Sequence, residues 1–181
     1  MKHRAGRRPD RESGVAAIEF VLVMPVLLLL FVGMISLTSY ISILRKTSSA
    51  AELAADLVSR HIATIKRSEI DDYVTGTKQL FLPRPPEGIN VEVYNFFKAE
   101  SGETETRWKH PFPDGQLCTA PDTSSSEITE LLTKGDVVVA VVCVPGYLSP
   151  ADFLGSAQLG QIHKTSALRP RHTTTLTLAQ E

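Results

Sequence analysis

One apolar run near the N-terminus constrains this chain more than any other feature. From Val15 to Leu44 there are thirty residues and a single formal charge, the carboxylate of Glu19. A helix needs about 20 apolar residues to cross a bilayer, so the run is long enough to span a membrane and to emerge from it. The sequence therefore predicts one transmembrane helix over 15–44.

Glu19 is the unusual residue of this run. A carboxylate inside a membrane helix costs about 2.5–3.5 kcal/mol on insertion scales. Two explanations are open: the side chain reaches the aqueous interface, or an opposite charge from a neighbouring chain offsets the cost.

The charges on the two sides of the run predict its orientation. Residues 1–14 hold five basic and two acidic residues, whereas Arg45 and Lys46 follow the run. Basic residues favour the cytoplasmic side, so 1–14 is predicted to be a basic cytoplasmic leader and 45–181 an extracytoplasmic domain. Residues 15–181 hold 14 basic and 18 acidic residues, and this balance argues against a nucleic-acid partner.

The start of the run resembles a known class of membrane protein. The basic leader ends in Gly14, and Glu19 and Phe20 follow at the fifth and sixth positions after it. This arrangement resembles type IV prepilins, in which a membrane aspartyl protease cuts after the glycine. With Pro25 and the leucines that follow it, the stretch is similar more narrowly to the TadE-type pseudopilins of the tight-adherence (Tad/Flp) pilus system. The run Val137–Val144 and the segment after it fit that family's closing hairpin more loosely.

The resemblance implies a minor pilin or pseudopilin in the inner (cytoplasmic) membrane, taking part in assembly of a pilus for adhesion or secretion. Its partners would be membrane lipid, other pilin subunits, Tad assembly components and a prepilin peptidase that cuts between Gly14 and Val15. Cleavage would create an amino group on Val15, which is cationic at neutral pH and could pair with Glu19 of a neighbouring subunit. Phe20 and Pro25 would take part in assembly, and Pro25 is expected to kink the helix.

An alternative function is open. The same anchor could remain uncleaved and display an extracytoplasmic binding or sensor domain. The mature N-terminus separates the two hypotheses, because it is Val15 after cleavage and Met1 without it.

Beyond the run, helical spacing of apolar residues predicts that one helix continues from Val15 to about Lys66. Such a helix would be about 78 Å long. A second helix is predicted to start at Ser68, to be broken by Gly76 and to end at Pro83. The apolar stripe expected to face the domain consists of Ala50, Leu53, Ala54, Leu57, Val58, Ile62 and Ile65.

The remaining chain predicts a small antiparallel sheet. Alternation over 89–97 indicates a strand, a turn at 100–103 leads to a second strand over 104–108, and a short helix is expected over 127–134. The continuous apolar run Val137–Val144 indicates a central strand, with 160–169 beside it, and 173–178 either extends the sheet or frays. The predicted fold class is α+β and pilin-like, with a long N-terminal transmembrane helix that continues into a soluble domain.

Two cysteines, Cys118 and Cys143, are candidates for a disulfide in an oxidising compartment. By loop length the bond would contribute about 3.5 kcal/mol. Two reduced, buried cysteines are the alternative, and the mass of the purified protein after thiol alkylation distinguishes them.

No residue pattern indicates catalysis. Asp122, Ser124 and Ser126 have the D-x-S-x-S spacing of a metal-ion-dependent adhesion site, but no buried strand precedes them, so Ser126 is expected to cap the next helix instead. The five histidines lack the paired spacing of a zinc site, and the charges of Glu103, Glu105 and Arg107 are expected on a solvated face. The chain is therefore predicted not to be an enzyme and to use no metal and no cofactor.

Overall fold

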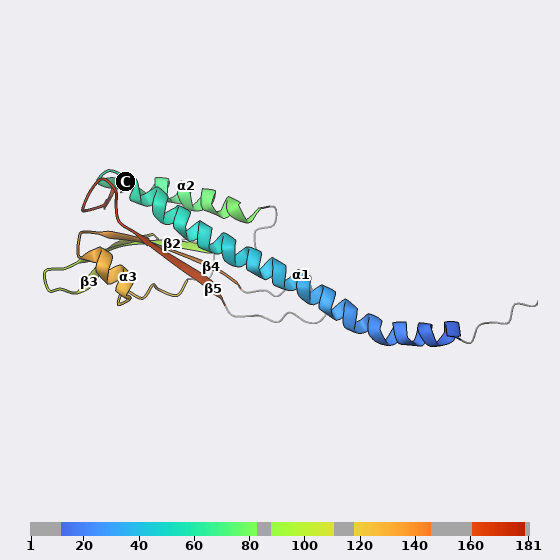
Figure 1. Cartoon of the computed structure of the whole chain (residues 1–181). Helices are drawn as coiled ribbons and strands as arrows, with labels where there is room; N and C mark the ends of the chain where they lie inside the picture. Colours follow the sequence, from blue (N-terminus) through green and yellow to red (C-terminus); the bar gives the residue numbers. More distant parts are fainter. Residues whose placement is uncertain (1–11, 83–87, 111–117, 146–160, 180–181) are drawn as a thin grey trace, which may run out of the picture.

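The computed structural model describes residues 12–82, 88–110, 118–145 and 161–179 (Figure 1). A long helix dominates it, and a small α+β domain packs on the C-terminal part of that helix. In chain order the elements are α1 (Glu12–Ser59), β1 (Thr64–Lys66), α2 (Arg67–Lys78), the 3₁₀ turn η1 (Gln79–Phe81), β2 (Asn90–Lys98), β3 (Thr104–His110), α3 (Ser126–Leu132), β4 (Val137–Val144), β5 (Ile162–Leu168) and β6 (Thr177–Ala179). This arrangement confirms the predicted fold class.

The main sheet has four antiparallel strands in the order β3-β2-β4-β5. The C-terminal part of α1 crosses one face of this sheet, and α3 lies on the other (Figure 1). Because both faces are covered, the domain has one hydrophobic cluster on each side of the sheet.

The position of β4 in the sheet explains why its sequence is apolar throughout. All eight of its residues are buried. Successive side chains of a strand point to opposite faces, so Val138, Ala140 and Val142 face the α1 cluster, while Val139 and Val141 face the α3 cluster.

Helix α1 approaches the sheet closely because its inner face is built from small residues. Ala50, Ala51, Ala54 and Ala55 are each at most 1 % exposed and pack with Val58 against the strands. The predicted stripe is correct for Ala50, Ala54 and Val58. It is wrong for Ile62, which is 72 % exposed because α1 has ended before it.

The predicted continuation of α1 to Lys66 is therefore wrong. The helix ends at Ser59, and Ala63 adopts a left-handed conformation with φ of 66°, which turns the chain into β1. Two contacts with the C-terminal segment hold this turn: the Arg171 N–H donates to the Ser59 carbonyl (2.8 Å) and the Thr177 N–H donates to the Ala63 carbonyl (2.8 Å).

Strand β6 neither extends the main sheet nor frays. It pairs in parallel with β1, with Ile65 opposite Leu178, and forms a separate two-stranded sheet. The buried side chain of Leu176, just before β6, belongs to the α1 cluster, so burial as well as pairing fixes the C-terminal segment.

The second helix also differs from its prediction. It begins at Arg67, and Glu69 accepts a hydrogen bond from the Lys66 N–H (2.9 Å) at its first turn. Gly76 does not break it, because Ile70 and Val74 on the same helix are fully buried and their packing outweighs the cost of about 1 kcal/mol for a glycine.

The other predicted elements exist, with shifted ends. Strand β3 runs to His110 rather than 108, and β5 covers Ile162–Leu168 rather than 160–169. Helix α3 begins at Ser126 with Ser125 at its N-cap, so the expectation that Ser126 is the cap is wrong.

Candidate functional site: the apolar half of α1 and its supports

Helix α1 has two halves with different surroundings. Most large apolar side chains from Ile18 to Ile41 are 40 % exposed or more, and Val32 and Tyr40 are half-buried, whereas Thr47 and the alanines after it are buried against the sheet. By length and composition, α1 is the helix of the described chain that is able to cross a membrane. Its apolar half extends away from the domain with no other described element around it (Figure 1).

The predicted processing site lies at the very start of α1. Gly14 and Val15 are the third and fourth residues of the helix. The first N–H groups of a helix have no partner within it, and helix ends open locally at little cost. A protease therefore needs to unwind only one turn to reach the bond between these two residues.

Glu19 and Phe20 lie on the open surface of the same half. Both side chains are exposed, Phe20 by 60 %. The ion pairs between described residues all lie in the soluble domain, so none involves Glu19. Within the described part of a single copy, the charge of Glu19 is therefore not compensated.

Pro25 lies inside α1, which continues through it. Figure 1 shows α1 bending within its blue N-terminal part, which contains this proline. Further along, Ser36 Oγ donates to the Val32 carbonyl and Thr38 Oγ1 donates to the Met34 carbonyl, each at 2.8 Å. These bonds satisfy the hydroxyl donors without a partner helix, as an apolar surrounding requires.

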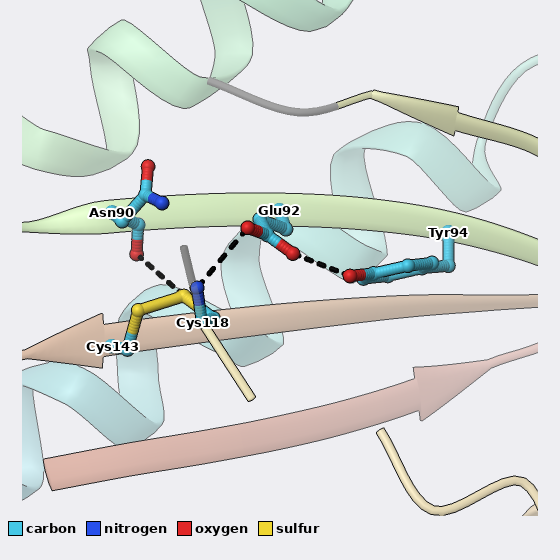
Figure 2. Close-up of a disulfide and its surroundings, with 5 residues drawn as sticks. All are labelled: Asn90, Glu92, Tyr94, Cys118 and Cys143. Carbon is cyan, nitrogen blue, oxygen red and sulfur yellow. Dashed lines mark hydrogen bonds between the residues drawn. A yellow bond between two sulfur atoms is a disulfide. The ribbon is translucent and has the colours of Figure 1, made fainter. Parts of the chain in front are cut away.

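A disulfide joins Cys118 and Cys143, with their Cα atoms 5.6 Å apart. It ties the segment before α3 to the end of the central strand β4. Figure 2 shows this bond beside β2, where Cys118 Sγ lies 3.7 Å from the Asn90 carbonyl oxygen.

A buried carboxylate lies next to this disulfide. Glu92 on β2 is fully buried, and its Oε1 accepts a hydrogen bond from the Cys118 N–H (3.1 Å). Its Oε2 accepts a second from the Tyr94 hydroxyl (Figure 2). Burial, and then the hydrogen bond to Glu92, raise the pKa of Tyr94 well above its ordinary value, so Tyr94 remains a donor at neutral pH.

A second buried carboxylate ties the C-terminal segment to the sheet. Asp136, 3 % exposed, accepts hydrogen bonds from Arg107 Nε (2.9 Å) and Nη2 (3.3 Å) and from the Leu176 N–H (3.0 Å). Trp108 Nε1 donates to the Leu176 carbonyl (2.8 Å). The expected solvated face is confirmed, because Glu103, Glu105 and Arg107 are all exposed. The pairing of Arg107 with Asp136 was not predicted.

Ion pairs stabilise the C-terminal end of α1. Asp56 accepts hydrogen bonds from Arg60 and Arg171. The hydrogen bond from Arg60 is the main cause that lowers the pKa of Asp56, and Arg171 acts in the same direction. This group joins the last turns of the helix to the C-terminal segment.

The D-x-S-x-S segment forms a local turn ahead of α3. Ser124 donates both its N–H (2.9 Å) and its Oγ–H (2.6 Å) to Asp122 Oδ1, and these bonds lower the pKa of Asp122. The described residues directly before it, 118–121, form no strand. In the described residues no three His, Cys, Asp or Glu side chains come together as a metal site would require.

Sequence reasoning missed both buried carboxylates. Glu92 lies between Val91 and Val93 within β2, and Asp136 directly precedes the apolar run of β4. An acidic residue within or next to a predicted buried strand was the available signal, because a buried charge requires partners.

Together, the open apolar half of α1 and the α+β domain on its other half define a single-pass membrane protein. Residues 14–56 match the family model described as TadE-like protein. The predicted resemblance is thereby confirmed over these residues, which cover most of α1 and none of the main sheet. No curated protein and no solved structure matches the chain. The similarity suggests a Tad pilus-related membrane protein, from a family that is structural rather than catalytic.

Proposed function

We propose that this protein is a minor pilin or pseudopilin of a Tad-type (Flp) pilus system, processed by a prepilin peptidase after Gly14. The observation that carries the proposal is where the family match falls. It begins at Gly14 and follows α1 through an open apolar half that contains one carboxylate, Glu19. A plain anchor needs neither the glycine nor the charge.

The proposed topology divides the chain into three parts. Residues 1–14 form the cytoplasmic leader, 15–44 cross the inner membrane, and 45–181 form the extracytoplasmic domain. The excess of basic residues in the leader supports this orientation. The disulfide between Cys118 and Cys143 supports it too, since such bonds persist in oxidising compartments.

The proposed assembly step uses the new N-terminus. Removal of the leader gives Val15 a free, cationic amino group, one helical turn from Glu19 of the same chain. In a bundle of subunits this amine and the Glu19 carboxylate of a neighbour attract each other in a low-dielectric surrounding. Each charge then offsets the desolvation cost of the other, and the exposed side chain of Phe20 packs between helices. The soluble domain would contact other pilus components.

The first prediction concerns processing. In cells that express a prepilin peptidase, the Gly14→Phe variant is expected to keep its leader, because a bulky side chain at the residue before the cut blocks the peptidase site. N-terminal sequencing of membrane-extracted protein should give Val15 for the unchanged chain and Met1 for the variant.

Gly33→Phe is the matched control. Gly33 is also a glycine of α1, and a Cβ there would meet no atom within 4 Å, so its processing should be normal. An unchanged chain that starts at Met1 would contradict the proposal and favour the uncleaved anchor with a binding or sensor domain.

The second prediction concerns assembly. The Glu19→Ala variant is expected to be cleaved normally but to crosslink to other pilin subunits about tenfold less, which corresponds to about 1.4 kcal/mol. Crosslinking in membranes of cells with the whole pilus system, followed by immunoblotting, measures this.

Glu52→Ala serves as the control, since Glu52 is an exposed carboxylate on the domain half of α1. Equal crosslinking of the Glu19 and Glu52 variants would show that the proposed intersubunit pair does not form.

A further inference from the structure

Two exposed leucines stand at the end of η1. Leu80 is 38 % exposed and Leu82 is 56 % exposed, whereas Phe81 between them is buried in the core. Among the described residues outside α1, Ile62 is the other exposed large hydrophobic side chain. Two of these three residues therefore lie in one short turn, which the buried Phe81 holds in place.

This turn lies at the end of the domain that is nearer to the apolar half of α1. Helix α2 runs back alongside α1 from the far end of the domain (Figure 1). At the end of this return, Lys46 Nζ donates a hydrogen bond to the Leu82 carbonyl (3.2 Å). Ile41, the last strongly exposed apolar residue of α1, is about 7.5 Å from Lys46 along the helix axis.

The length of the apolar run places this turn at the membrane surface. Thirty residues of helix from Val15 to Leu44 extend about 45 Å, and a bilayer with its headgroups is about 40–45 Å thick. Arg45 and Lys46 then stand at the level of the lipid phosphates, which attract basic residues. Because Lys46 donates a hydrogen bond to the Leu82 carbonyl, Leu80 and Leu82 also lie at the level of the phosphates.

We propose that Leu80 and Leu82, flanked by Arg45 and Lys46, form a lipid-contacting surface that seats the domain on a bilayer with anionic headgroups. The leucines enter the boundary between headgroups and acyl chains, and the basic side chains bind the phosphates. The patch lies beside the end of the apolar half of α1, where Lys46 donates to the Leu82 carbonyl. Two leucines are also far fewer than the roughly 20–30 residues that each partner contributes to a stable protein interface, so lipid is a better occupant than a second copy.

The inference rests on α1 crossing the bilayer, but not on cleavage or on other pilus proteins. Its test uses the full chain in vesicles of phosphatidylcholine and phosphatidylglycerol, with the native disulfide oxidised. An environment-sensitive fluorophore is attached to the single added thiol of Leu82→Cys or, as the control at the other end of the domain, of Ile62→Cys. Lipids that carry a nitroxide on the headgroup serve as the quencher.

The fluorophore at position 82 is expected to emit at shorter wavelength and to be quenched several-fold more than the one at position 62. Adding Arg45→Gln to Leu82→Cys should reduce that quenching. Equal quenching at the two positions would overturn the proposal. Energy transfer between copies labelled at position 82 that rises with the ratio of protein to lipid, without lipid quenching, would also overturn it and assign the patch to a second copy. Because no other pilus protein is present, either failure leaves the pilin hypothesis untouched.

Discussion

Replacing both Cys118 and Cys143 with alanine is expected to lower the free energy of unfolding of the soluble domain by about 3.5 kcal/mol, and by less when Glu92 is already glutamine. The disulfide holds the backbone N–H of Cys118 on the buried carboxylate of Glu92 (3.1 Å). Without the bond this segment is free to leave, and the charge would keep one donor, the Tyr94 hydroxyl. A buried charge that loses a partner is costly, whereas a neutral glutamine is less so.

The chain provides its own probe for this measurement. Trp108 is the single tryptophan, and it is buried in the domain. Urea unfolding of the full-length protein in detergent micelles, followed by the fluorescence of Trp108, therefore reports on the sheet rather than on the apolar half of α1.

A double-mutant cycle gives the coupling between the disulfide and Glu92, which we expect to be about 1–3 kcal/mol, as for residues that share one network. Glu105→Gln is the control. This carboxylate is exposed on β3, so the effect of its substitution on the free energy of unfolding should add to that of removing the disulfide. If the effects of the disulfide and of Glu92→Gln add to within about 0.5 kcal/mol, the Cys118 amide does not stabilise the carboxylate.

The Asp136→Ala variant is expected to lose about 3 kcal/mol of domain stability. It removes the acceptor for the Arg107 guanidinium and leaves the Leu176 N–H without its partner. An unsatisfied buried donor costs about 1–3 kcal/mol by itself. Urea unfolding followed by Trp108 fluorescence measures the total, and amide exchange at Leu176 measures the local part.

Two controls separate the roles of Asp136. The Asp136→Asn variant keeps an acceptor oxygen and should lose less than Asp136→Ala. Asp122→Ala removes an exposed carboxylate and should change domain stability little. Stability of Asp136→Ala within about 0.5 kcal/mol of the unchanged protein, the range of ordinary surface substitutions, would mean that pairing with β1 and burial of Leu176 hold the C-terminal segment without the Asp136 carboxylate.

Residues next to one another in the sequence are enough to predict the membrane helix and the central strand. Val15–Leu44 is apolar over the length of a bilayer, and Val137–Val144 is apolar over the length of a strand that both clusters bury. Gly14 and Glu19 could also be identified as candidate site residues from the sequence, because their predicted roles depend only on their spacing along one helix. The length of a continuous apolar run is enough to distinguish a membrane helix from a buried strand.

The residue at which α1 ends and the partners of the buried charges are decided by tertiary structure and could not be predicted from the sequence. Helical spacing continues past Ser59, but the helix stops there because the C-terminal segment supplies Arg171 and Thr177 to its last carbonyl and to the turn after it. Likewise Arg107 has carboxylates two and four residues away, yet it pairs with Asp136, which directly precedes β4. These contacts join residues from 29 to more than a hundred positions apart in the sequence, so no local pattern predicts them. The helix ends where packing and hydrogen bonding to distant segments are more favourable than another turn.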